Sequence, residues 1–234
     1  LRYGGRDAFI IELEANTKEE LIIDKIDLSS LATLGDGHES AEPIEALVYE
    51  DRVFILFQQI LRGPRLWKSS FATIGVFDRD GLHELGRIQL SLKNPHGFLV
   101  HNHKLWVYGS DDLLSPPHPM QAGGEVISLK DYQKGPHFYS NLPIWDMAIN
   151  SQGDGLLVKI SDKGNNRQLY QVSIKGEDIE VNPLSLWDIN DIEVNQSGDF
   201  WLAQGARREN SGLRILEGNS LQEVGFVSLP LLPE

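Results

Sequence analysis

The sequence contains no cysteine and only 2 methionines among its 234 residues. Without a thiol, the chain can form no disulfide, no thiolate metal centre and no cysteine nucleophile. It also lacks any apolar run of the roughly 18 residues that a membrane-spanning helix needs. The longest runs, such as Val53–Phe57, have the length of one β-strand. We therefore expect no membrane span.

Basic residues are also scarce. The 21 Lys and Arg residues stand against 34 Asp and Glu residues, and the formal net charge is −13. The mean field of such a protein repels a phosphate backbone unless a local basic patch intervenes. The one compact basic pair, Arg207 and Arg208, is too small for that. We therefore expect no nucleic-acid partner.

The sequence does contain a β-hairpin pattern that recurs along the chain. Residues 190–205, NDIEVNQSGDFWLAQG, repeat the outline of residues 145–160, WDMAINSQGDGLLVKI, at an offset of 45. This offset superposes Asp146 on Asp191, Asn150 on Asn195 and Gly153 on Gly198. Two earlier copies follow when residues 105–107 are set against 156–158, at an offset of 51, and residues 53–55 against 105–107, at an offset of 52.

Each hairpin is followed by two further runs rich in Val, Ile, Phe and Tyr and bounded by Gly, Asp, Asn or Ser, which is typical of antiparallel strands. Four strands in every 45 to 52 residues indicate β-propeller blades, because a single four-stranded sheet must stack on neighbours to bury both faces. A β-sandwich is the alternative. Helices should be nearly absent, and β-branched residues favour a strand in the one helix-like stretch, residues 16–28.

We therefore predict an all-β fold, a single β-propeller domain over residues 1–234, built from four-stranded antiparallel blades. There should be about five blades, the first incomplete, which implies a parent chain that is longer at its N-terminus; six or seven blades would need more chain. The predicted parts are a half blade, 1–30, and blades at about 42–91, 94–141, 144–186 and 189–229.

The hairpins share the phrase apolar-x-apolar-(Asn/Asp)-x-x-Gly-x-(aromatic/apolar)-x-apolar, seen best in DIEVNQSGDFWLA and DMAINSQGDGLLV. In this phrase the chain resembles the NHL, SMP-30/gluconolactonase and YVTN (surface-layer) propellers. Residues 104–132 look most like a YVTN blade. The WD40 repeat is a poorer match, because its Gly-His start is absent. The resemblance implies a propeller fold, and the function has to be argued from sites.

In a propeller the first strand of each blade lines the central channel, so the residues that begin these strands meet at one channel mouth. The apolar alternation places Glu45, Gly97, Asp146 and Asp191 in one ring, and Ile44, His96, Trp145 and Asn190 in the next. We predict a binding site at this mouth, formed by Glu45, His96, Trp145, Asp146, Asn190 and Asp191.

Three of the four residues in the first ring are acidic, and converging carboxylates suit a hard cation such as Ca²⁺. SMP-30-like lactonases hold a divalent metal with a Glu, Asn and Asp set. The resemblance thus implies Glu45, Asn190 and Asp191 as metal ligands, with Asp146 in the same ring. The alternative is that Asp146 and Asp191 accept hydrogen bonds from backbone N–H groups of adjacent blades.

Two long connections are further candidates for binding, since loops of this length often carry function. They are residues 109–124, GSDDLLSPPHPMQAGG, and residues 58–70, QQILRGPRLWKSS. The second combines basic and aromatic side chains that suit a carboxylate-bearing or glycan ligand, although a solvated loop is the alternative. The predicted contact residues are Arg62, Arg65, Trp67, His118 and Met120.

Two functions follow from these residues. The first is a non-enzymatic binding or scaffold module that engages a protein or glycan partner, without catalytic residues or a cofactor. We expect it to be a monomer, secreted or periplasmic, with a lipid anchor on a preceding segment or a cytoplasmic location as alternatives. The second is a divalent-metal-dependent lactonase or related hydrolase, in which Ca²⁺ or another divalent cation at the mouth activates a water molecule.

Overall fold

The computed structural model describes most of the chain, and the described segments are residues 7–13, 20–28, 31, 42–62, 67–111, 122–140, 142–160, 166–175, 178–205 and 211–228. The chain forms two compact units, Leu1–Pro95 and His96–Glu234. We call them the N-terminal and the C-terminal unit. The prediction of a single domain over residues 1–234 stays a prediction.

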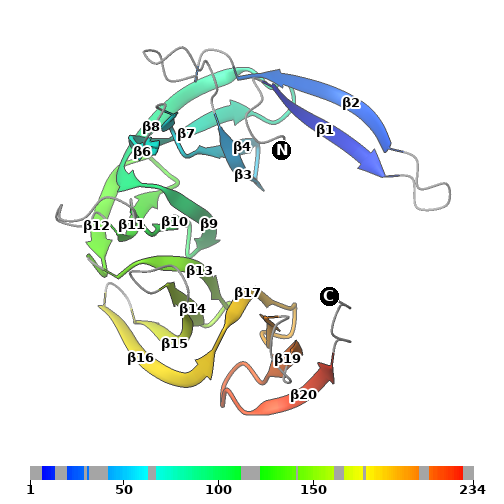
Figure 1. Cartoon of the computed structure of the whole chain (residues 1–234). Coiled ribbons are helices and arrows are strands. Elements are labelled where there is room, and N and C mark those ends of the chain that lie inside the picture. The colour runs from blue at the N-terminus through cyan, green and yellow to red at the C-terminus, as the bar shows by residue number, and fades with distance from the viewer. Residues whose placement is uncertain are drawn as a thin grey trace. The chain divides into compact units, whose positions relative to one another are not determined.

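The N-terminal unit contains three antiparallel sheets (Figure 1). β1 (Asp7–Leu13) pairs with β2 (Glu20–Asp27). The four-stranded sheet β3–β8 has the order β3 (Pro43–Tyr49), β4 (Arg52–Phe57), β7 (Phe71–Asp78), β8 (Glu84–Lys93). A short hairpin of β5 (Ile60–Arg62) and β6 (Trp67–Ser69) lies between β4 and β7 in the sequence. Part of the connection predicted as a loop at residues 58–70 is therefore a strand pair.

The C-terminal unit contains three four-stranded sheets, each a meander of consecutive antiparallel strands. Sheet β9–β12 has β9 (Pro95–His101), β10 (Lys104–Gly109), β11 (Gly123–Ser128) and β12 (Lys134–Phe138). Sheet β13–β16 has β13 (Ile144–Ile149), β14 (Asp154–Ile160), β15 (Arg167–Lys175) and β16 (Asp178–Trp187). Sheet β17–β20 has β17 (Ile189–Val194), β18 (Phe200–Gln204), β19 (Gly212–Leu216) and β20 (Glu223–Ser228).

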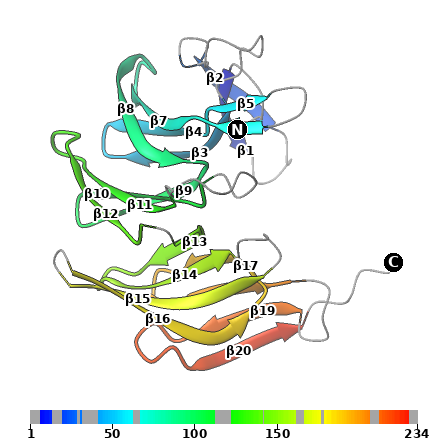
Figure 2. The ribbon, with the colours of Figure 1, turned by 60° about the vertical axis from the view of Figure 1, so that its left-hand side comes forward.

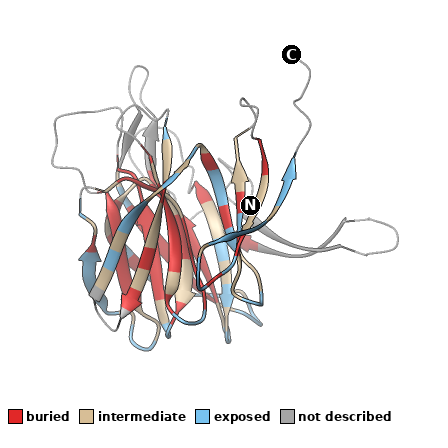
Figure 3. Ribbon diagram, turned by 90° about the horizontal axis from the view of Figure 1, so that it is seen from below, coloured by how far each residue is buried: buried red, intermediate tan, exposed pale blue. Residues whose placement is uncertain are grey.

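Burial differs systematically among the strands of a sheet (Figure 3). The second strands β4, β10 and β14 are near-continuous apolar runs and are buried almost throughout, as expected for strands covered on both faces. The fourth strands β12 and β20 are exposed at nearly every position. The inner strands therefore hold the core, and each outer strand forms an edge.

The sheets of the C-terminal unit pack face to face, and Figure 2 shows sheet β13–β16 lying against sheet β17–β20. Between sheets β9–β12 and β13–β16 the core contains Trp106, Tyr108, Val126, Phe138, Met147, Ile149, Leu157, Val172 and Ile174. Between sheets β13–β16 and β17–β20 it contains Ala148, Leu156, Val158, Leu169, Ile192, Phe200, Leu202 and Leu216. Burying such a side chain stabilises the fold by about 1.5–3 kcal/mol, so the interfaces between sheets supply much of the core.

These two cores correct one predicted alignment. Leu156 faces the following sheet, and its equivalent in sheet β9–β12 is Trp106, which also faces the following sheet. The facing residues thus match at an offset of 50, and the predicted offset of 51, which set Leu105 on Leu156, was wrong by one residue. A slip of one residue moves a side chain to the opposite face of its strand. The cause is the β9–β10 turn, where Asn102 and His103 at φ 50° and 56° close a two-residue hairpin.

The repeated turn that the sequence predicts is present in both later sheets. Asn150 Oδ1 accepts hydrogen bonds from the backbone N–H groups of Gln152 and Asp154, at 3.0 and 3.1 Å. Asn195 Oδ1 accepts the backbone N–H of Asp199 at 2.9 Å. Gly153 and Gly198 both have φ of 90°, a conformation that glycine adopts without a Cβ clash. One local chemistry therefore closes both hairpins.

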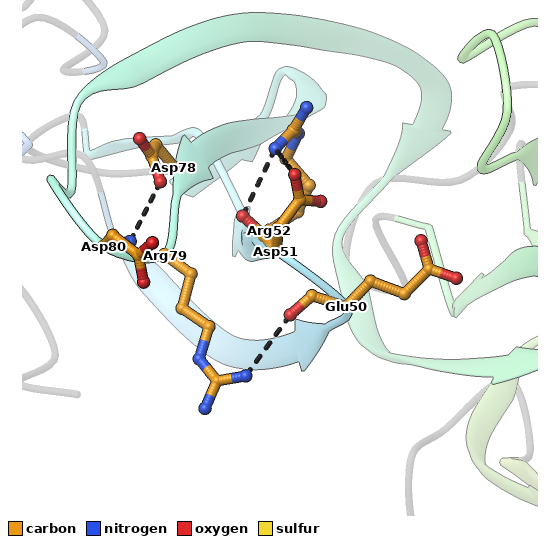
Figure 4. A network of polar contacts seen from close by, with 6 residues as sticks. All are labelled: Glu50, Asp51, Arg52, Asp78, Arg79 and Asp80. Atoms are coloured by element: carbon orange, nitrogen blue, oxygen red, sulfur yellow. Dashed lines mark hydrogen bonds and ion pairs between the residues drawn. The ribbon is translucent and has the colours of Figure 1, made fainter.

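In the N-terminal unit, backbone and charge contacts join two neighbouring hairpin turns (Figure 4). The backbone N–H of Arg79 donates to Asp51 O at 3.0 Å, and the Arg79 guanidinium donates to Glu50 O at 3.4 Å. Asp78 Oδ1 accepts the N–H of Asp80 at 2.9 Å within its own turn. Because these groups are exposed, the charged contacts contribute less than about 1 kcal/mol each. Their effect is to hold the β3–β4 and β7–β8 turns together.

The predicted fold class is confirmed, since the chain is all-β and four of its sheets are four-stranded and antiparallel. The described residues include no α-helix, and residues 20–27 of the one helix-like stretch form strand β2. Among the same residues, no helix has the length and apolarity that crossing a membrane would require.

Candidate functional site

Five of the six residues predicted for the channel mouth fall on the first strands of three sheets in the C-terminal unit. His96 lies near the start of β9, Trp145 and Asp146 near the start of β13, and Asn190 and Asp191 near the start of β17. Trp145 and Asn190 occupy equivalent β-bulges, where the pairing register shifts between Ile144 and Asp146 and between Ile189 and Asp191. A bulge redirects a side chain and interrupts regular pairing. The repeat therefore gives Trp145 and Asn190 the same redirected orientation in their two sheets.

Trp145 is the centre of this cluster. Its indole lies 4.6 Å from the His96 ring, centroid to centroid, at an angle of 42°. The Arg167 guanidinium lies 4.1 Å above the Trp145 ring, which is a cation–π contact. Trp145 Nε1 donates to Asn190 O at 3.0 Å, and the Arg167 guanidinium donates to Asn190 Oδ1. We call the four residues His96, Trp145, Arg167 and Asn190 the inner-strand cluster.

Beside this cluster, Asp146 joins three sheets through one carboxylate. Its Oδ1 accepts hydrogen bonds from the Tyr108 hydroxyl at 3.1 Å and from the backbone N–H of Met147 at 2.8 Å. Its Oδ2 accepts the backbone N–H of Ile192 at 2.7 Å. Tyr108 belongs to sheet β9–β12 and Ile192 to sheet β17–β20. Asp146 therefore acts as the structural alternative predicts, as an acceptor for an adjacent sheet.

Burial shifts the titration of three groups here. It raises the pKa of Asp146 to about 7, with the nearby Asp191 carboxylate adding to the rise and the hydrogen bonds to Asp146 opposing it. It lowers the pKa of His96 to about 4, and the positive charge of Arg167 lowers it further. It also lowers the pKa of Arg167, which the Asp188 carboxylate opposes. At neutral pH His96 is therefore uncharged, with Nε2 2.6 Å from Ser110 Oγ.

The described residues offer little to a metal ion. No three His, Asp or Glu side chains among them gather closely enough to hold one. Both oxygens of Asp146 already accept hydrogen bonds from N–H or O–H donors, and Asp191 is exposed. What the arrangement offers chemically is a cation fixed on an aromatic ring beside amide and carboxylate groups.

The other predicted site residues lie elsewhere. Glu45 is on β3, in the N-terminal unit. Arg62 on β5 and Trp67 on β6 are paired across the short hairpin in their backbone register. Arg65, His118 and Met120 lie outside the described residues. For all of these the binding role stays a prediction.

Sequence reasoning missed Arg167, which opens β15. A signal existed, because the first and third strands of an antiparallel meander begin at the same end of the sheet. Arg167, at the start of the strand-like run RQLYQVSIK, was therefore bound to lie at the end where Trp145 begins β13.

Among solved structures, several resemble this chain over most of its length. A hypothetical selenium-binding protein from Sulfolobus tokodaii has a TM-score of 0.65 at 11% identity, covering 95% of this chain and 57% of that one. The Pan2 WD40 domain of Neurospora crassa has a TM-score of 0.52 at 11% identity, with coverages of 79% and 49%. The Cps50 (Swd1) β-propeller domain of Myceliophteria thermophila has a TM-score of 0.52 at 9% identity, with coverages of 81% and 60%.

The chain folds as a β-propeller. Its four-stranded sheets are the blades, and the pair β1–β2 stands as a separate two-stranded sheet. No protein-family model and no curated protein matches the sequence, so the likeness to YVTN and NHL repeats stays a prediction. The chain spans about half to three fifths of the similar structures. At such low identity the likeness establishes the fold alone.

Proposed function

We propose that this propeller is a non-enzymatic binding or scaffold module, and that a protein partner binds where the inner strands of its C-terminal unit begin. The single observation that carries the proposal is the Arg167 guanidinium held 4.1 Å above the Trp145 ring. Trp and Arg are the side chains most enriched among residues that dominate protein–protein binding energy. The fold agrees with this, since one similar structure is described as a WD40 domain and another is found in a mitotic checkpoint complex.

The arrangement is preorganised for binding. Asn190 fixes Trp145 through its carbonyl and Arg167 through its side-chain oxygen, so neither side chain has to be ordered by the partner. Avoided ordering contributes directly to affinity, at about 0.5–1.5 kcal/mol per long side chain. We call Trp145, Arg167 and Asn190 the Trp–Arg surface.

At this surface a protein suits the geometry better than a glycan. A sugar stacks on a free aromatic face, whereas the Trp145 ring is already in contact with Arg167 and His96. A guanidinium that remains partly exposed can still pair with a carboxylate of a partner protein. The proposal therefore includes acidic side chains in the partner's contact region.

The metal-dependent hydrolase is not favoured. Both carboxylate oxygens of its proposed ligand Asp146 accept hydrogen bonds that hold the sheets together. A secreted or periplasmic location and a monomeric state remain parts of the proposal, supported by composition alone. The residues predicted from the two long connections remain candidates for additional contacts with the partner; they are Arg62, Arg65, Trp67, His118 and Met120.

The experiment is an affinity capture with the purified protein as bait, followed by measurement of the dissociation constant for the captured protein. We expect Arg167→Ala and Trp145→Ala each to weaken binding by about thirtyfold, which is the usual effect of truncating a residue that dominates an interface. Val224→Ala is the matched control, because Val224 is 65% exposed on the outer strand β20. A wild-type bait that retains no partner, or a partner that binds both variants unchanged, would overturn the proposal.

A further inference from the structure

A second polar site lies at the opposite end of the same strands, where β13 and β17 finish. A hollow of about 190 Å³ opens there between the β13–β14 turn, the β17–β18 turn and the β19–β20 turn. Its lining is polar throughout, apart from two glycines, and consists of Asn150, Ser151, Gln152, Ser197, Gly198, Asp199, Glu217, Gly218 and Asn219. None of these residues belongs to the Trp–Arg surface.

Asn150 supplies a fixed hydrogen-bonding group to this hollow. Its side chain is only 4% exposed. Two backbone N–H groups donate to its Oδ1, which fixes the orientation of the amide. Its Nδ2 then lies on the side of the hollow, 3.6 and 3.9 Å from the positions that a Cβ would take at Gly218 and Gly198. Within the described part of the chain, no group accepts a hydrogen bond from this Nδ2, which is accessible from the hollow.

The equivalent residue of the next sheet shows that the turn does not by itself leave the side-chain N–H without an acceptor. Asn195 closes the same turn, but its Nδ2 donates to Asp199 Oδ2 at 3.3 Å. The Asn150 amide is therefore the one of the pair that is available to a ligand.

The chemistry of the lining selects the ligand. It must accept a hydrogen bond from Asn150 Nδ2, which an ammonium or guanidinium group cannot do. It should also donate to Asp199 and Glu217, whose negative charges repel an anion, while the lining contains no basic residue. A hydroxyl both donates and accepts. The volume has room for about six water molecules at about 30 Å³ each, which suits one small ring.

From this geometry we propose that the hollow between the three turns binds a neutral polyhydroxylated ligand, a single sugar ring, through the side-chain amide of Asn150. The hollow requires a glycine at position 218, because a Cβ there would lie 2.2 Å from Gly198 O. The close approach of these two backbones brings the β19–β20 turn up to the amide. The site is distinct from the Trp–Arg surface, and it does not depend on the function proposed for that surface.

The test is a titration of the ¹⁵N-labelled protein with glucose, galactose, mannose and N-acetylglucosamine, following by NMR the Asn150 side-chain amide signals and the backbone amide signals of Gly198 and Gly218, which remain in every variant. We expect a saturable shift of these signals with at least one sugar, and none with inorganic phosphate. Asn150→Asp keeps the oxygen that closes the turn and replaces the donor, so it should weaken binding by at least about tenfold. Asn182→Asp is the matched control, because Asn182 is exposed on the outer strand β16, and it should retain binding.

A second variant covers the case in which Asn150→Asp does not fold. Ser151 is an exposed lining residue, and Ser151→Trp should fill the hollow and abolish the shift without altering the turn bonds of Asn150. Arg167→Ala should leave sugar binding unchanged. Failure of every sugar to shift the Asn150 amide, or a shift that persists in Ser151→Trp, would overturn the proposal, as would saturable binding of acetamide in place of the sugars.

Discussion

At the scale of single residues, two equivalent aspartates have opposite environments. Asp146 accepts hydrogen bonds from three sheets, whereas its repeat partner Asp191 is exposed. The amino acid is the same and so is its place in the repeat. The Tyr108 hydroxyl of the preceding sheet and the backbone N–H of Ile192 in the following sheet both donate to Asp146, and these contacts make it a structural carboxylate.

This difference predicts unequal effects of one substitution. Asp146→Asn replaces a carboxylate oxygen by an NH₂ group that faces N–H or O–H donors, so at least one buried hydrogen bond is lost. We expect a loss of about 1–3 kcal/mol in the free energy of unfolding. Asp191→Asn should change it by less than about 0.5 kcal/mol. Urea unfolding of both variants measures this, and equal effects would show that Asp146 does not join the sheets.

Asp146 and His96 should also give the protein two opposing pH dependences. Between pH about 4 and 7 the folded chain keeps a proton on Asp146 that the unfolded chain releases, so this group lowers the free energy of unfolding as pH rises. Between pH about 4 and 6.5 the unfolded chain binds a proton on His96 that the folded chain does not, so His96 raises it. The two contributions largely cancel in the wild type.

Removing either group should reveal the pH dependence that the other gives to the free energy of unfolding. Relative to the wild type, Asp146→Asn should lose stability on acidification from pH 6.5 to 4, and His96→Gln should gain stability on acidification from pH 7 to 4. Each slope should be at most about 1.4 kcal/mol per pH unit. Urea unfolding across this range gives the three curves. Parallel curves for all three proteins would contradict the burial argument.

At the scale of elements, the repeated hairpin uses the same glycine in two surroundings. Gly153 and Gly198 share φ of 90°, and alanine in such a left-handed conformation costs about 1–2 kcal/mol. At Gly153 an added Cβ would also lie 2.9 Å from Ile174 O, whereas at Gly198 the nearest atom is Asn150 Cβ at 3.8 Å.

We therefore expect Gly153→Ala to be more destabilising than Gly198→Ala. Gly86→Ala is the control, because no atom lies within 4 Å of an added Cβ there, and it should stay within about 0.5 kcal/mol of the wild type. Thermal unfolding of the three variants ranks them. An equal or larger loss at Gly198 would mean that the contact with Ile174 does not add to the cost of the turn conformation.

At the scale of the whole molecule, we expect no dependence of stability on a divalent metal. A bound ion stabilises the folded chain by mass action and makes the unfolding temperature respond to a chelator. The described residues bring no three potential ligands together, so EDTA should leave the unfolding temperature unchanged and elemental analysis should find only trace metal. Stoichiometric Ca, Mg, Mn or Zn, lost together with stability on chelation, would restore the hydrolase alternative.

The sequence by itself determined the all-β class and the repeated hairpin, because strand alternation and turn chemistry are local. Asn150, Gly153, Asn195 and Gly198 close their turns with bonds between residues at most four positions apart. The mouth residues Trp145 and Asn190 could be found for the same reason, since the offset of 45 fixes their equivalence.

Tertiary structure alone decided what these residues contact. The Arg167–Trp145 contact and the hydrogen bond from Ile192 to Asp146 join residues 22 and 46 positions apart, and no local pattern encodes such distances. The alignment of sheet β9–β12 was wrong by one residue because turn length shifts register while leaving the apolar alternation intact. The hollow beside Asn150 needs three turns from two sheets, so it exists only once those sheets have packed.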